Sequence, residues 1–277
     1  MVQRWQVLSL REKVIAITRP QEQAKALADI IVERKGIPII APTVEIKPAP
    51  NLQLVEEFLD ILFSGRVDVV IFMSRNGVTS LFEASERTEK NIDLVLALNR
   101  TINVAVGPKT KEVLEKTGIR VNHIPSEFSS IGVIDIMKKL DLEGKIVAIP
   151  RNEFHNNYLK LELERYHAII LEVPVYTTAL PVDKKPVLSL IKDMLENKVD
   201  IITFTSSSSV NNLFKIADEA ELADALRQCL NGDIVVATIG PVTKQTLEYF
   251  NVKIPIIPKK YTIEAMVDSL ENYLSMT

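Results

Sequence analysis

The chain of 277 residues is long enough for about two average domains. Its 47% hydrophobic and 25% charged residues are ordinary for a folded protein, which excludes wholesale disorder and collagen-like sequence. With 33 basic and 36 acidic residues, the net charge of −3 argues against a broad nucleic-acid-binding surface. Apolar runs such as residues 69–73 are far shorter than the about 20 residues of a membrane helix, so we expect no membrane span.

Cysteine and histidine usage limits the possible chemistry. Cys229 is the only cysteine, which excludes an intrachain disulfide and a thiolate metal site. The three histidines, His123, His155 and His167, are scattered and form no metal-binding signature. Residues 1–12 lack the apolar region and cleavage site of a secretory signal. We therefore expect a cytoplasmic protein without metal, nucleic-acid or membrane partners.

Short runs of apolar and β-branched residues alternate with amphipathic segments along the chain. Such runs are typical of strands buried on both faces of a parallel sheet. They cover residues 14–18, 37–40, 69–73, 102–106 and 121–124 in the first half, and residues 146–149, 168–173, 201–205, 234–239 and 254–257 in the second. The alternation predicts two α/β domains with parallel sheets.

Helical patterns occupy residues 21–35, residues 108–117 and a segment that begins at Pro241. We expect these helices to end at Gly36, Gly118 and Asn251, because glycine and asparagine tolerate the left-handed conformation that follows many helices.

The two halves of the chain repeat one another. KVIAITR at residues 13–19 matches KIVAIPR at 145–151, VDVVIFMS at 67–74 matches VDIITFTS at 199–206, and GPKT at 107–110 matches GPVT at 240–243. The matches keep their order and almost constant spacing, and the repeat is too long for a solenoid unit. The sequence therefore predicts an internal duplication, with two similar α/β domains.

Two segments are longer than ordinary strands of about 5–6 residues. Residues 37–48 and 168–181 both have an extended pattern and occupy equivalent places in the repeat. We expect them to join the domains as linker strands. Domain 1 would then be discontinuous, with residues 1–40 and 178–277, and domain 2 would cover residues 48–168. The alternative is two sequential domains, residues 1–140 and 141–277.

Polar side chains follow several of the predicted strands, at the sheet edge where ligands of open α/β folds bind. They include Ser74, Asn76, Thr110, Ser206, Ser208 and Thr243. Serine, threonine and asparagine at these places can cap helices, which stabilises a helix by about 0.5–2 kcal/mol. They can equally face an anionic ligand together with the free amides of the helix N-termini.

Three further residues have two interpretations each. Arg19 and Arg151 end equivalent strands and either pair with a nearby carboxylate or bind a carboxylate of a ligand. Tyr176 lies in the second long extended segment, where the first repeat has Val44. It is either a half-buried strand tyrosine with a wet hydroxyl, or a residue by which a duplicated scaffold acquired asymmetric chemistry.

The motifs occur in the order TRP, FMSRNGV, GPKT, IPR, VPVYTT, FTSSSSV and IGPVT. This order, together with the duplication, resembles the uroporphyrinogen-III synthase family from Lys13 to Leu274. The resemblance implies two α/β domains joined by a two-stranded ladder, and an enzyme that uses no cofactor. It also implies that the substrate is hydroxymethylbilane, which is dehydrated and cyclised with inversion of ring D through a spiro intermediate.

The family's motifs also imply roles for individual residues. Its tyrosine falls on Tyr176, our candidate proton donor. Its polar substrate-binding residues fall on Ser74, Asn76, Thr110, Ser206, Ser208 and Thr243. The protein is expected to act as a monomer on this small molecule.

Two other functions stay open at this stage. A two-lobed cytosolic protein that binds a small molecule without catalysis would also have paired α/β domains. A different α/β enzyme, such as a sugar or nucleotide transferase, is less well supported, because the sequence has no phosphate-binding glycine run.

Overall fold

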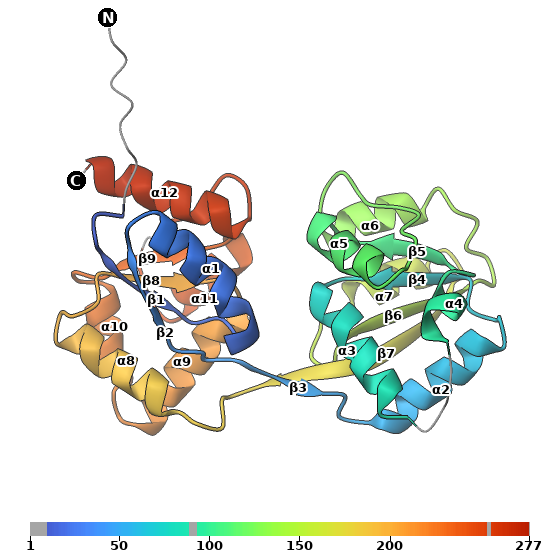
Figure 1. The fold of residues 1–277 in the computed structure, drawn as a ribbon, viewed down its shortest axis with the longest axis horizontal. Coiled ribbons are helices and arrows are strands. Elements are labelled where there is room, and N and C mark those ends of the chain that lie inside the picture. The colour runs from blue at the N-terminus through green and yellow to red at the C-terminus, as the bar shows by residue number, and fades with distance from the viewer. Residues whose placement is uncertain (1–9, 89–92, 254–255, 277) are drawn as a thin grey trace, which may run out of the picture. The chain divides into compact units, whose positions relative to one another are not determined.

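The computed structural model describes residues 10–88, 93–253 and 256–276. They form two compact units (Figure 1). Unit 1 comprises the described residues of Met1–Glu45 and Ala179–Thr277, and unit 2 is Ile46–Thr178. Each unit is a sheet of mainly parallel strands covered by helices on both faces, so the prediction of two parallel α/β units is confirmed.

Unit 1 is built on a four-stranded parallel sheet. The strand order is β2 (Ile37–Ile40), β1 (Val14–Ile17), β8 (Ile201–Phe204) and β9 (Val235–Thr238). In register, Ala16 of β1 pairs with Ile39 on one side and Ile202 on the other, and Ile202 pairs with Val236. All four residues of β8 are buried, as expected for a central strand covered on both faces.

Two groups of helices cover this sheet. On one face, α1 (Gln21–Glu33) and α12 (Ile263–Met276) pack over Ile15 and Ile17. On the other, α8 (Lys185–Leu195), α9 (Ser207–Glu219), α10 (Ala223–Leu230) and α11 (Pro241–Tyr249) enclose a core around Ala16, Ile202 and Phe204. Alternate residues of one strand therefore enter two different cores, which follows from the two-residue period of a strand.

Unit 2 is built on a five-stranded sheet. Its order is β3 (Glu45–Pro48), β7 (Ile169–Ala179), β6 (Ile146–Asn152), β4 (Val69–Phe72) and β5 (Ile102–Ala105). The pairs β7–β6, β6–β4 and β4–β5 are parallel. The edge strand β3 and the long strand β7 are neighbours, and both extend across the boundary between the two units in the sequence.

The helices of unit 2 repeat this two-sided arrangement. On one face, α2 (Leu52–Phe63), α3 (Arg75–Glu86), α4 (Leu94–Leu98) and α5 (Pro108–Lys116) pack over Val70 and Phe72. On the other, α6 (Ser130–Met137) and α7 (Tyr158–Glu164) pack over Val69 and Ile71.

Matching residues of the sequence repeat make matching contacts in the two units. In unit 1, the carboxylate of Asp200 accepts a hydrogen bond from the amide of Val14 at 2.8 Å and forms an ion pair with Lys13 at 2.6 Å. In unit 2, Asp68 accepts from the amide of Ile146 at 2.9 Å and from Lys145 at 3.0 Å. In both sheets, the first strand of one repeat thus pairs with a strand of the other repeat.

Several local predictions need correction. Helix α1 ends at Glu33, and Lys35, with φ 60°, takes the left-handed position that we expected for Gly36. Gly36 is required for packing instead, because a Cβ there would lie 2.8 Å from Cγ2 of Ile31. By contrast, Gly118 (φ 84°) and Asn251 (φ 58°) take the left-handed conformation, as predicted.

Two predicted strands also differ. Residues 37–48 form two short strands, β2 and β3, in different sheets. Residues 121–124 form no strand, and only His123 makes an isolated bridge, to Val104. Of the predicted strand 254–257, residues 254 and 255 lie outside the described residues, and Ile256 makes the equivalent bridge, to Ala237.

Candidate functional site

The carboxyl ends of β4, β6 and β7 bring four of the predicted site residues together in unit 2. Ser74 follows β4 and Asn76 is in the first turn of α3, Arg151 lies near the end of β6, and Tyr176 is on β7. Between Arg151 and Asn152 the register of β6 and β7 shifts, so that Arg151 pairs with Pro174 but Asn152 pairs with Tyr176. Such a bulge alters the direction of the side chains that follow it.

Tyr176 is 7% exposed, and its hydroxyl oxygen lies 3.3 Å from Oγ of Ser74. Asn76 is a second hydrogen-bond partner of this hydroxyl. Burial raises the pKa of Tyr176 above its usual value of 10.0, and the hydrogen bond from Ser74, the charge of Arg151 and the hydrogen bond from Asn76 act in the opposite direction. The wet, half-buried tyrosine that the sequence also allowed is therefore wrong.

Ser74 has a structural role as well as its contact with Tyr176. It is the N-cap of α3, and its Oγ accepts a hydrogen bond from the amide of Gly77 at 3.0 Å. A Cβ at Gly77 would lie 2.7 Å from the carbonyl oxygen of Pro150, so glycine is needed where α3 approaches β6. The capping and functional interpretations of Ser74 are thus compatible, since one oxygen serves both.

A partly buried carboxylate, that of Glu172, holds Arg151 in place. The Arg151 side chain is 11% exposed, and its Nη1 lies 3.3 Å from Oε1 of Glu172 on β7. Oε1 of Glu172 is also 2.7 Å from Nε2 of His155, and Oε2 is 3.6 Å from Nζ of Lys160. Burial lowers the pKa of Arg151 below its usual value, and Glu172 and Tyr176 oppose that shift.

The sequence reasoning missed Glu172 and its partners. The available signal was a single charged residue inside the apolar run IILEV at residues 169–173. A charge in a buried strand needs a partner, because removing an unpaired ion from water is costly. The pattern did not show which basic side chains would meet it, since Arg151, His155 and Lys160 reach it from β6 and the segment that follows.

Thr110 is the remaining predicted residue of unit 2. It is buried in the first turn of α5, which packs beside α3. The N-cap of α5 is Gly107, and no side chain caps this helix. Thr110 is therefore in a first helical turn, as predicted, but it does not cap the helix.

Unit 1 holds the other four predicted residues. Ser206 is the N-cap of α9, where its Oγ accepts from the amide of Ser209 at 3.2 Å, and Ser208 lies half-buried in the same first turn. Thr243 is buried in the first turn of α11, which has no side-chain cap. Arg19 is 9% exposed and donates from Nη2 to Gln23 at 3.1 Å.

The two units differ at the place of Tyr176. Its repeat partner, Val44, is buried and has no group that can transfer a proton. The hydroxyl of Tyr176 therefore has no counterpart in unit 1, whereas Ser74 and Ser206 are counterparts in both sequence and capping role.

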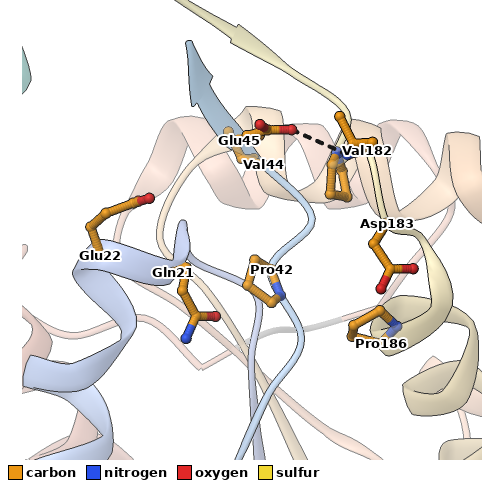
Figure 2. A pocket seen from close by; sticks show the side chains of 9 residues that line it. Gln21, Glu22, Pro42, Val44, Glu45, Val182, Asp183 and Pro186 are labelled. Atoms are coloured by element: carbon orange, nitrogen blue, oxygen red, sulfur yellow. Dashed lines mark hydrogen bonds between the residues drawn. The ribbon is translucent and has the colours of Figure 1, made fainter.

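A pocket of about 260 Å³ in unit 1 is lined in part by Val44 and by none of the predicted site residues (Figure 2). Its lining includes Gln21 and Glu22, the first residues of α1, and residues on either side of Glu45 and Val182. The amide of Val182 donates a hydrogen bond to Glu45 at 3.1 Å. Of the described residues that line it, Glu22, Glu45 and Asp183 are acidic and none is basic. This pocket is unsuited to an anionic ligand.

Metal clusters and membrane spans are both absent from the part of the chain that the structure describes. Within it, no group of three or more histidine, cysteine, aspartate or glutamate side chains is arranged to hold a metal ion. In the same residues, no helix has the length and apolar character needed to cross a membrane.

Comparison with known proteins adds independent information. A family model described as uroporphyrinogen-III synthase HemD matches residues 25–268. A protein of Methanothermobacter thermautotrophicus assigned as a uroporphyrinogen-III synthase is 34% identical over 260 residues, which cover 92% of this chain and 96% of the relative. The uroporphyrinogen-III synthase of Chlorobaculum parvum is 25% identical over 252 residues, 90% of this chain and 94% of its own.

Solved structures show the same fold. A mutant uroporphyrinogen-III synthase of Thermus thermophilus matches with a TM-score of 0.65 at 21% identity, over 96% of this chain and 100% of its own. The enzyme of Helicobacter pylori matches with a TM-score of 0.60 at 18% identity, again over 96% and 100%. On the match of the family model and the 34% identical relative, this chain belongs to the uroporphyrinogen-III synthase family, the cyclising lyases of porphyrin biosynthesis.

Proposed function

We propose that the family's reaction, the dehydration and cyclisation of hydroxymethylbilane, takes place at the cluster of Tyr176, Ser74, Asn76 and Arg151 in unit 2. The observation that carries this proposal is the hydroxyl of Tyr176, which is buried beside Ser74 and has no counterpart in unit 1. A duplicated scaffold offers two similar sheet edges, and only this one has a proton donor at that place.

The first chemical step requires an acid. The hydroxyl of the substrate's hydroxymethyl group leaves as water when a proton is added to its oxygen, and its carbon remains on the ring as the methylene of an azafulvene cation. Tyr176 supplies that proton, because a phenol is protonated at neutral pH, and burial raises its pKa further. Attack by the substituted carbon of ring D then gives the spiro intermediate. The bond between the spiro carbon and the bridge to ring C then breaks, which leaves an azafulvene on ring C. The other α-carbon of ring D attacks it, and the proton that this carbon loses restores the phenol.

Arg151 supplies the matching charge. The substrate carries eight carboxylates, and Arg151 is a largely buried cation, 11% exposed, whose charge acts on the tyrosine. Its Nε has no hydrogen-bond partner among the described residues, and one of its Nη atoms contacts Glu172. A guanidinium held in this way can bind a substrate carboxylate with a defined orientation.

The remaining predicted residues position the substrate. Ser206, Ser208, Thr243 and Arg19 in unit 1, together with Thr110 in unit 2, lie at or beside helix N-termini, where carboxylates are favoured. Most of the catalytic effect is then positioning, because the free bilane cyclises unaided to the uninverted type I isomer. The domain limits 1–40 with 178–277 and 48–168, and the linker strands 37–48 and 168–181, belong to this proposal.

The decisive experiment supplies the purified protein with enzymatically generated hydroxymethylbilane and separates the type I and type III products. An enzyme of this family increases type III above the protein-free blank. A protein that binds the bilane without catalysis leaves only type I, and that result would contradict the proposal.

The cellular setting is part of the same proposal. A lone cysteine suits a reducing cytoplasm, and we expect a monomer. Light scattering of the purified chain measures its mass, and a dimer would correct that expectation.

A further inference from the structure

An exposed aromatic ring lies at the same place in each unit. Phe128 precedes α6 and is 60% exposed, and Tyr261 precedes α12 and is 63% exposed. The two positions are separated by the same number of residues as Gly107 and Gly240, so they are repeat-equivalent. A single exposed aromatic side chain is ordinary, but exposure of one at the same place in both repeats makes this position a candidate for binding.

Each ring is packed against a glycine. A Cβ at Gly107 would lie 3.3 Å from Cγ of Phe128, and a Cβ at Gly240 would lie 3.4 Å from Cδ1 of Tyr261. The φ angles of these glycines are −171° and −175°, which any residue adopts. The backbone therefore does not require glycine here. At Gly107 a Cβ would be tight against the ring, whereas at Gly240 it would make an ordinary contact with it.

The segment after each ring is anchored in the same way. Ser129 caps α6 by accepting from the amide of Gly132 at 3.2 Å, and Thr262 accepts from the amide of Ala265 at 3.2 Å. The ring thus stands just before a capped helix, with one side against the Gly-Pro turn of the neighbouring helix and much of its surface in solvent. Thr110 and Thr243, which we expect to contact substrate, follow those same turns.

We propose that Phe128 and Tyr261 are substrate-binding residues whose exposed faces stack on pyrrole rings of the linear tetrapyrrole. The inference rests on the proposed function and extends it. It assigns recognition of the planar pyrrole rings to two uncharged aromatic side chains, which would not be chosen to bind the carboxylates. Aromatic pairs in offset or edge-to-face contact gain about 0.5–1.5 kcal/mol beyond the area they bury. An aromatic side chain fixed next to a capped helix can hold one pyrrole of a flexible chain in place while the last ring changes its orientation.

A structural role makes different predictions. A residue before an N-cap often packs against the fourth residue of its helix as a hydrophobic staple, and then it affects stability alone. Kinetic measurements distinguish the two roles. Loss of a staple lowers the stability of the folded protein, whereas loss of a stacking contact with substrate changes KM and the ratio of type III to type I product.

The test compares Phe128→Leu and Tyr261→Leu with wild type in the bilane assay. Leucine keeps an apolar contact with the glycine and lacks an aromatic face. We expect KM to rise about three- to tenfold, as loss of stacking implies, with a smaller share of type III product. Phe128→Tyr and Tyr261→Phe should restore wild-type values. Tyr249→Leu, 81% exposed at the other end of α11, is the matched control and should change neither quantity.

The outcomes distinguish this inference from the proposed function. Wild-type protein that makes no type III isomer contradicts the function itself. Active wild type with leucine variants that melt at lower temperature but keep KM and the isomer ratio shows a staple only, and overturns the inference. Thermal melting of each leucine variant accompanies the kinetics, so that loss of fold is separated from loss of stacking.

Discussion

The hydroxyl oxygen of Tyr176 lies 3.3 Å from Oγ of Ser74, although 102 positions separate them in the sequence. The same Oγ accepts the amide of Gly77, so the first turn of α3 and strand β7 meet at one serine. This contact places a protonated phenol at the carboxyl edge of the sheet of unit 2, beside the guanidinium of Arg151.

Replacing Tyr176 by phenylalanine tests the phenol directly. We expect turnover to fall by about 10²-fold, the lower end of the range for general acid catalysis. The unfolding free energy should fall by only about 1 kcal/mol, since one hydrogen bond is lost and the ring stays. Type III product formation and urea unfolding measure the two effects. Tyr158→Phe, at an exposed tyrosine, is the control. Wild-type turnover in a folded Tyr176→Phe protein would remove this residue from the mechanism.

The pH dependence follows from the direction of the same pKa. Burial raises the pKa of Tyr176, and the active form is the protonated phenol, so this group should cause no loss of turnover between about pH 7 and about pH 9. A decline is expected only above about pH 10. In Arg151→Gln the cation that lowers this pKa is absent, and the decline should move to still higher pH. Turnover measured against pH in both proteins checks this. A tyrosine-dependent decline near about pH 8 would contradict it.

Glu172→Gln should affect substrate binding through Arg151. Without the carboxylate, Arg151, His155 and Lys160 remain close together with no anion between them. We expect KM to rise several-fold and the unfolding free energy to fall by about 1–3 kcal/mol, the usual value of a hydrogen bond to a charged group. Steady-state kinetics and urea unfolding measure both. Glu162→Gln, which loses only an ion pair with Arg165 on α7, should leave KM unchanged.

The matched aspartates predict matched stability effects. Asp68→Ala and Asp200→Ala each leave a strand amide without its carboxylate and a lysine without its partner. We expect each to reduce the unfolding free energy by about 1–2 kcal/mol, with no change in activity per folded molecule. Asp68→Asn and Asp200→Asn, whose amide oxygen still accepts the strand amide, should lose less. Chemical unfolding followed by circular dichroism checks the order. An alanine variant as stable as its asparagine counterpart would contradict the assigned contact.

Local features of this protein were readable from its sequence. The strands at residues 14–17, 69–72 and 201–204 fall within apolar runs, and Ser74 and Ser206 cap helices because their side chains reach amides three residues ahead. The repeat also drew attention to Tyr176, where the two halves differ. The end of the first helix was predicted incorrectly. Lys35, and not Gly36, has the left-handed conformation, and Gly36 is small because a Cβ at this position would be too close to Ile31.

Strand pairing was decided by the tertiary structure alone. β1 pairs with β8 and β6 pairs with β4, so each sheet combines strands of both repeats. The repeats carry nearly the same apolar strands, and backbone hydrogen bonds do not distinguish one copy from the other. A local pattern therefore cannot select the partner, and only the packing of all the helices on each sheet does so. The contact of Glu172 with Arg151 follows from that pairing, because β6 and β7 must be neighbours before the carboxylate can reach the guanidinium.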